Sequence, residues 1–253
     1  MVLQRLNMDN SWYLQFGGIR WLVDPWLIGA EIDFFSWFNK QWHRTKPIEI
    51  GDVPPYDRVL ITQKYPDHFH PQTLKALNPK YLIVPSSIQK KVRKVCPQAE
   101  VSSFEEVQAS SALGICKIHH LPSQRTMDPI YDGLLLEDGE SSVLLATHGY
   151  HPSWTPMMKD CPPLKIALTP FDEYLLPAIL GGAVSPGMEA VRELISDVSP
   201  QYVVATHDED KHAQGLISRL AKITKAPAHH VLSADPLLKD RLLTIEDYQP
   251  ITL

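Results

Sequence analysis

The sequence is poor in the features that mark several large classes of protein. Its 253 residues contain only three cysteines, at unrelated spacings: Cys96, Cys116 and Cys161. An odd number of scattered cysteines fits neither a disulfide framework nor a zinc site built from thiolates, and it suits a reducing compartment. We therefore expect a cytoplasmic protein.

Excess positive charge and long apolar runs are also absent. The formal net charge is −5 and no run of lysine and arginine stands out, which argues against a nucleic-acid-binding surface. No apolar window approaches the roughly 20 residues of a membrane span, and the first residues lack the apolar core of a signal peptide. With 44% hydrophobic and 21% charged residues, the composition is that of a globular protein, and we expect a single domain over 1–253.

Among the features that are present, a polar loop follows a short apolar strand between Asp57 and Leu77. The β-branched run Val59–Thr62 predicts a buried strand. The loop after it contains Asp67 and His68, and Pro71 then opens a helix. A carboxylate beside an imidazole, on a loop that leaves a core strand, is typical of metal ligands and catalytic groups. An Asp that caps a turn beside an exposed His is the structural alternative.

Polar residues end three other predicted strands. Asp24 follows the strand at 19–23 and is either a turn residue or a group that supports a ligand. His148 follows a strand at 143–146, and His207 follows one at 202–205. We expect a helix after His207 to about Lys222 and a last strand at 242–245. Ligands from several strand ends converge when the strands lie side by side in one layer. We therefore expect Asp67, His68, His148 and His207 to converge.

These landmarks resemble the metallo-β-lactamase fold superfamily, in the branch of soluble hydrolases that includes the ascorbate-phosphate lactonase. The resemblance covers nearly the whole chain. It rests on Trp21-Leu22-Val23-Asp24-Pro25, on Asp67-His68 in place of the H-x-H-x-D-H signature, on His148 at the later Gly-Asp-Thr motif and on His207 at the late strand-end histidine. It implies a mixed α/β (α+β) fold, a four-layer αββα sandwich with the site at one edge.

The departures from the superfamily pattern fall together on one of its two metal sites. The resemblance places three residues that are not histidine at the first site: Gln63, Tyr65 and Gln124. His148 matches the carboxylate that bridges the sites. A carboxylate can bind two cations, whereas a neutral imidazole offers one lone pair. A site that binds a single metal ion needs no bridging ligand, so the loss of the bridge agrees with the loss of the first site. We expect at most one tightly bound divalent ion, with Asp67, His68, His148 and His207 as ligands. Zinc is the first expectation, iron and manganese are alternatives, and an empty vestigial site is the structural alternative.

The resemblance implies a metal-dependent hydrolase of a small ester-, lactone- or phosphoester-like molecule. The catalytic candidates are Asp67 and Tyr65, and the hydroxyl of Tyr65 is suited to donate a hydrogen bond to a developing oxyanion. Two other functions stay open at this point. One is a non-catalytic ligand-binding protein that kept the fold, and the other is a single-metal redox protein.

The segment 34–42 is dense in aromatic residues: Phe34, Phe35, Trp37, Phe38 and Trp42. A loop folded onto the core, an apolar lid over the site and a homodimer contact are all consistent with this composition. A second apolar stretch, Leu175–Gly182, ends in a glycine pair that could act as a hinge.

Overall fold

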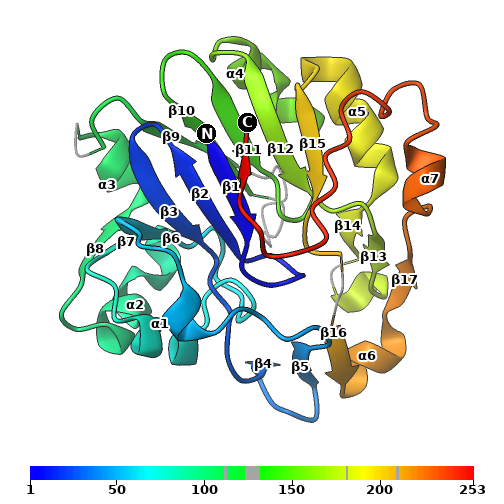
Figure 1. Ribbon diagram of the computed structural model, residues 1–253. Coiled ribbons are helices and arrows are strands. Elements are labelled where there is room, and N and C mark those ends of the chain that lie inside the picture. The colour runs from blue at the N-terminus through cyan, green and yellow to red at the C-terminus, as the bar shows by residue number, and fades with distance from the viewer. Residues whose placement is uncertain (111–112, 123–131, 181, 209–210) are drawn as a thin grey trace. The chain divides into compact units, whose positions relative to one another are not determined.

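The computed structural model describes residues 1–110, 113–122, 132–180, 182–208 and 211–253 (Figure 1). Contacts within the chain divide it into two units. Unit 1 contains the described residues of 1–118, 210–218 and 246–253, and unit 2 contains those of 119–209 and 219–245. The expectation of a single domain over 1–253 stays a prediction.

The main sheet of unit 1 has seven strands in the order β18-β1-β2-β3-β6-β7-β8. These strands are β1 (Val2–Arg5), β2 (Trp12–Phe16), β3 (Ile19–Val23), β6 (Arg58–Leu60), β7 (Tyr81–Val84), β8 (Glu100–Ser103) and β18 (Ile251–Thr252). The two-residue turn between β2 and β3 has positive φ at Gly17 and Gly18, as the twist of a hairpin requires. The strands β3, β6, β7 and β8 run parallel, so helical crossovers must connect the later ones.

Two helices of unit 1 supply its crossovers, α1 (Pro71–Leu77) between β6 and β7 and α2 (Gln89–Val95) between β7 and β8, and a third helix, α3 (Phe104–Gln108), follows β8. Short 3-10 turns cover Ile50–Asp52 and Ser86–Ile88. The predicted helix from Pro71 is confirmed. Leu74 and Val92 bury the helices against the apolar faces of Leu22, Val59 and Leu82, and this contact forms the core of the unit.

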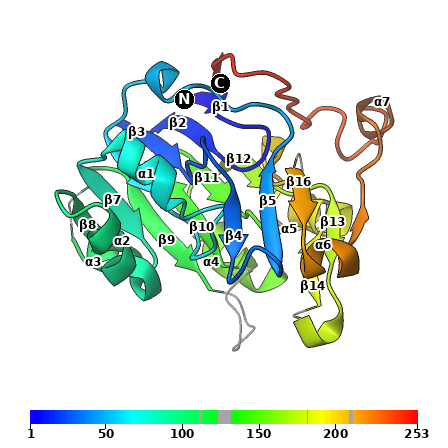
Figure 2. The same cartoon turned by 90° about the horizontal axis from the view of Figure 1, so that it is seen from below.

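A smaller sheet of unit 1 has the order β16-β5-β4, with β4 at Glu31–Asp33, β5 at Asn39–His43 and β16 at Lys211–Gln214 (Figure 2). We expected a continuous helix after His207 to about 222, and this was wrong. Residues Lys211–Gln214 pair with β5 instead, and only a short helix, α6 (Leu216–Leu220), follows. Pairing with a distant strand overrides the local helix propensity.

Residues 34–38 of the aromatic segment form the turn between β4 and β5, and Trp42 lies within β5. Phe34 is 84% exposed, Phe35 61% and Trp37 65%. The Phe35 and Trp37 rings stack with centroids 5.9 Å apart. The interpretation of these three residues as a loop folded onto the core was therefore wrong, because their side chains are exposed and their ring contacts lie within the turn. The lid and the homodimer contact stay predictions.

Unit 2 contains a five-stranded sheet in the order β15-β12-β11-β10-β9. Its strands are β9 (Lys117–Leu121), β10 (Gly133–Glu137), β11 (Ser142–Leu145), β12 (Leu164–Thr169) and β15 (Tyr202–Ala205). Strands β11, β12 and β15 are parallel, and β10 is antiparallel to β11. The helices α4 (Thr155–Lys159) and α5 (Met188–Val198) bury Met158 and Leu194 in a core with Leu135, Leu144 and Val203.

The remaining elements of unit 2 are a three-stranded sheet and one short helix. They are β13 (Glu173–Leu175), β14 (Ala183–Pro186), β17 (Lys222–Thr224), the 3-10 turn Ala178–Leu180 and α7 (His229–Leu232). The strand expected at 242–245 was wrong, since Leu242 forms only an isolated bridge with Val203. Gly181 of the suggested hinge lies outside the described residues. None of the helices in the described part of the chain has the length and apolar composition needed to cross a bilayer.

Candidate metal centre

Asp24 lies at the carboxyl end of β3 and is fully buried. Its backbone N–H donates to the Leu60 carbonyl at 2.9 Å, which fixes it beside the end of β6. Its Oδ1 accepts the Thr62 N–H at 2.7 Å, and its Oδ2 accepts Asn10 Nδ2 at 3.0 Å and the Thr62 hydroxyl. Asp24 is therefore more than a turn residue, because its carboxylate organises the loop that carries His68.

His68 receives its orientation from Asp24. The His68 Nδ1 atom lies 2.7 Å from Asp24 Oδ2. A carboxylate oxygen only accepts, so this contact assigns the proton to Nδ1 and the lone pair of the imidazole to Nε2. The Asn10 amide, whose nitrogen is 2.9 Å from the same ring atom, then donates to Asp24 Oδ2. This is the carboxylate–histidine pairing that holds metal ligands in the correct tautomer. The ring is completely buried, which fixes it further.

The Nε2 atom of His68 faces Asp67. It lies 3.8 Å from Asp67 Oδ1. Two ligands that each bind one ion at about 2.0–2.2 Å are separated by roughly 3–4 Å. Asp67 and His68 therefore have the spacing of two ligands of the same ion, and both side chains are buried.

A buried lysine lies on the other side of Asp67. The Lys211 ammonium, on β16, is 3.7 Å from Asp67 Oδ2 and 3.4 Å from Asp9 Oδ2. The positive charge of Lys211 attracts Oδ2 of Asp67, and Oδ1 is the oxygen that faces His68. The sequence reasoning missed this residue because it placed Lys211 in a helix, and no local signal marks it.

Further carboxylates make this part of unit 1 strongly acidic. Burial raises the pKa of Glu31 well above its ordinary value, and the charge of Asp67 raises it further. Burial and Asp67 also raise the pKa of Asp33. Burial is the main cause of both raised pKa values and the negative charge of Asp67 adds to it; a divalent cation beside Asp67 would offset the second contribution.

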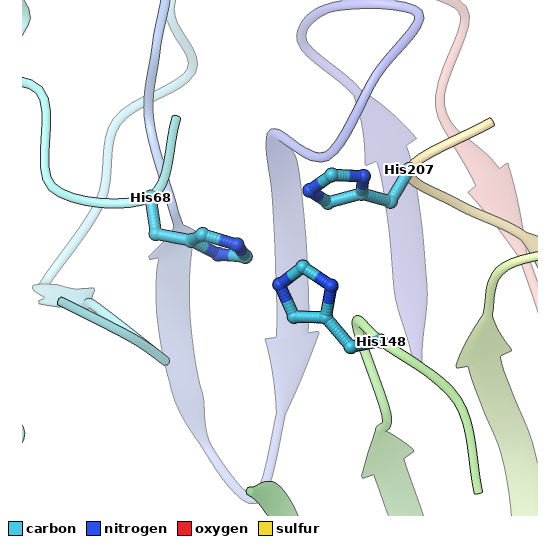
Figure 3. A group of neighbouring side chains, drawn as sticks. All are labelled: His68, His148 and His207. Carbon is cyan, nitrogen blue, oxygen red and sulfur yellow. The ribbon is translucent and has the colours of Figure 1, made fainter. Parts of the chain in front are cut away.

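The two other expected ligands lie together in unit 2. His148 follows β11 and His207 follows β15, so both are at the carboxyl ends of parallel strands. Their ring centroids are 4.8 Å apart at an angle of 50°, and both side chains are buried (Figure 3). His207 has a positive φ of 58°, which is uncommon outside glycine. Asp208 steadies this turn because its Oδ1 accepts the N–H groups of Phe171 and Asp172.

Comparison with known proteins identifies the family. A family model described as the beta-lactamase superfamily domain matches residues 7–207. The chain belongs to the beta-lactamase superfamily. No curated protein matches it.

Solved structures of this superfamily's fold superpose on the whole chain. An isothiocyanate hydrolase from Delia radicum gut bacteria has a TM-score of 0.70 at 17% identity, with 100% of this chain and 99% of that chain covered. A possible metal-dependent hydrolase from Veillonella parvula DSM 2008 has a TM-score of 0.74 at 13% identity, with the same coverage. CmlA, a diiron beta-hydroxylase from Streptomyces venezuelae, has a TM-score of 0.64 at 17% identity, and 54% of that chain is covered. The metallo-β-lactamase fold class predicted from the sequence is confirmed.

The predicted site residues of this superfamily member have different outcomes. Asp67 and His68 lie together in unit 1, and His148 and His207 lie together in unit 2. Convergence of all four on one ion stays a prediction. Tyr65 is half-buried and its carbonyl accepts the N–H groups of His68 and Phe69, while the catalytic role of its hydroxyl stays a prediction. Gln124 lies outside the described residues.

The donor atoms present fit a divalent metal ion. They are imidazole nitrogens and a carboxylate oxygen, buried and surrounded by further negative charge. Imidazole and carboxylate together suit zinc, iron and manganese.

Proposed function

We propose that this protein is a metal-dependent hydrolase of a small ester-, lactone- or phosphoester-like molecule and uses one divalent ion. Asp67 and His68 of unit 1 and His148 and His207 of unit 2 would be its ligands. The main support is the His68 imidazole, whose Nδ1 donates to Asp24 so that its Nε2 lone pair points to Asp67 Oδ1 at 3.8 Å. Figure 3 draws the three histidines of the proposal.

When bound, such an ion supplies Lewis acidity and brings the pKa of a water close to about 7. The chain's own residues prepare that chemistry. Asp24 keeps the His68 proton on Nδ1, and Lys211 holds one oxygen of Asp67 so that this carboxylate offers a single oxygen as a ligand. Burial of the histidines keeps bulk water away from their nitrogens and strengthens every charge interaction nearby.

The number of ligands favours particular ions. Four protein ligands on tetrahedral zinc leave no open position, which is typical of a structural site. Hydrolysis at this centre therefore requires a five- or six-coordinate ion, or one of the four side chains unbound. Manganese and iron accept the higher coordination more readily than zinc does. Zinc remains the first expectation from the resemblance.

Metal analysis of the purified protein distinguishes the hydrolase from the two alternative functions. Zinc or manganese that is lost in variants of Asp67, His68, His148 and His207 favours the hydrolase, iron lost in the same way favours a single-metal redox protein, and no metal at these residues favours a non-catalytic binder. The likeness to a diiron beta-hydroxylase supports testing for iron. The likeness to an isothiocyanate hydrolase supports adding isothiocyanates to a substrate panel of aryl esters, lactones and phosphoesters.

The test measures metal content and hydrolysis for Asp67→Asn, His68→Gln, His148→Gln and His207→Gln. We expect each variant to lose the ion and the activity together. His151→Gln and His212→Gln are matched controls, because His151 caps a 3-10 turn and His212 is exposed on β16. A His148→Gln variant that keeps as much metal as the unmodified protein, while His68→Gln loses one equivalent, would remove unit 2 from the centre.

A further inference from the structure

A second group of metal-ligating side chains lies within unit 2, apart from His148 and His207. It consists of His119 on β9, Glu137 at the end of β10 and Cys161 between α4 and β12. One ligand atom of each lies within 4.8 Å of the others. The His119 Nε2 atom is 3.4 Å from Glu137 Oε2.

This group is remote from the strand-end histidines. Glu137 pairs with Ser142 at the start of β11, whereas His148 follows the opposite end of the same strand. At about 3.3 Å per residue of extended chain, the two places are roughly 15–20 Å apart. The group is therefore not part of the centre that His148 belongs to.

The backbone around Cys161 is fixed against the same strands. Ser142 donates through its N–H to the Pro163 carbonyl and through its hydroxyl to the Pro162 carbonyl, each at 2.9 Å. The two prolines restrict this connection further. Cys161 also packs against the apolar core of unit 2. The thiol is thus held near the end of β10 by contacts that do not depend on a metal.

The chemistry of the three side chains points to a metal rather than to a simple ion pair. Glu137 is only 6% exposed. Among the described residues, the buried Nε2 atom of His119 has no hydrogen-bond partner, although it faces the Glu137 carboxylate. A tetrahedral ion with bonds of about 2.0–2.3 Å needs ligand atoms roughly 3.3–3.8 Å apart. The His119–Glu137 distance already meets this, and Cys161 lies within a small movement of it.

We propose that His119, Glu137 and Cys161 form a second, zinc-type site, with water as its fourth ligand. A thiolate together with an imidazole selects zinc over magnesium or calcium, which prefer oxygen ligands. The ion would join β9, an edge strand of the sheet, to β10 and to the connection before β12. The sequence analysis predicted at most one tightly bound ion, because Gln63, Tyr65 and Gln124 supply no imidazole at the superfamily's first site. The present proposal departs from that prediction and raises the expected metal content to two.

Cobalt is the probe that tests the proposal. Co²⁺ is titrated into the metal-free, full-length protein while the absorption spectrum is recorded. A thiolate ligand produces a sulfur-to-cobalt charge-transfer band in the near ultraviolet, and the proposed strand-end centre contains no sulfur. The band therefore reports on a cysteine ligand, independently of hydrolysis, and the Cys161→Ser variant assigns it. We expect one equivalent of cobalt to produce it and excess zinc to abolish it.

Variants identify the ligands. Cys161→Ser should lack the band, and His119→Gln and Glu137→Gln should weaken cobalt binding by about tenfold or more. His120→Gln is the matched control, since His120 is the next residue on β9 and pairs with Asp132 at 2.9 Å. The band should remain in His120→Gln, in Cys96→Ser and in His68→Gln. No band in the unmodified protein would overturn the proposal, as would a band that survives in Cys161→Ser or in a folded Cys161→Ala.

Discussion

Replacing Asp24 by Asn tests whether this buried carboxylate sets His68 for metal binding. Asn has nearly the same shape and keeps one acceptor oxygen, so the 2.7 Å bond from the Thr62 N–H to Oδ1 can be preserved. The amide group then takes the position of Oδ2. In the native protein that oxygen lies 2.7 Å from His68 Nδ1 and accepts Asn10 Nδ2 at 3.0 Å.

The substitution reverses the hydrogen bond to the imidazole. An amide N–H donates to His68 Nδ1, which moves the ring proton to Nε2 and removes the lone pair that faces Asp67. Loss of such a supporting partner typically lowers metal affinity about 10–100-fold, or roughly 1.4–2.7 kcal/mol. The bonds from Asn10 and the Thr62 hydroxyl are disturbed as well, and hydrogen bonds to a charged group contribute about 1.5–3 kcal/mol each. We expect weaker zinc binding and a less stable metal-free protein.

Competition with a chromophoric chelator measures the zinc affinity, and urea unfolding of the metal-free protein measures the stability. Asp57→Asn is the matched control, because Asp57 also accepts backbone and side-chain bonds in unit 1 but is half-exposed beside Arg20. Its zinc affinity should equal that of the unmodified protein. If Asp24→Asn also binds zinc with unchanged affinity, the assignment of the His68 tautomer and of its role as a ligand is refuted.

Three further predictions concern the same unit. Lys211→Met leaves buried carboxylates without a neighbouring positive charge and should destabilise the metal-free protein by about 3–5 kcal/mol. Zinc should raise the melting temperature of this variant more than that of the unmodified protein, and an equal rise in both would contradict the prediction. Because the pKa of Glu31 is raised in the folded protein, its ionisation lowers the free energy of unfolding at pH values above about 4.5 and has no effect below that pH. Glu31→Gln should therefore stabilise the metal-free protein at pH 8, and urea unfolding that shows a gain growing on acidification would disprove it. Trp37→Ala removes an exposed ring and should reduce a dimer to a monomer in light scattering at unchanged substrate affinity; lost affinity at constant mass would favour the lid.

Where the signal is local, the sequence was sufficient to predict the structure. The Gly17-Gly18 pair fixes a hairpin turn because two consecutive positive φ angles are required there. Pro71 marks the first residue of α1. The strand Tyr202–Ala205 was predicted with its bounds, since a short β-branched apolar run ends in a polar turn. These local signals also located the strand ends that carry the candidate ligands.

Where an element or side chain depends on a partner far away along the chain, the sequence alone could not predict the structure. The strand Lys211–Gln214 exists through pairing with β5, which lies far away along the chain, and its side chains carry no strand pattern. Asp24 was correctly placed at a strand end, but only its contact with His68 distinguishes a supporting carboxylate from a turn residue. The scattered cysteines excluded a site built from thiolates alone. They did not address a mixed site, whose three ligands come from three elements and leave no spacing to recognise.

The charges around Asp67 connect the metal to folding. In the metal-free protein, the Lys211 ammonium faces two carboxylates, Asp67 and Asp9. Burial, together with the charge of Asp67, raises the pKa of Glu31, so Glu31 resists ionisation. A divalent ion beside Asp67 would relieve that resistance and lower the pKa of Glu31 again. Binding would then release protons, so metal affinity should rise with pH above the ordinary pKa of a carboxylate. The buried carboxylates that we expect to destabilise the metal-free protein at neutral pH are thus the same groups that favour a bound cation.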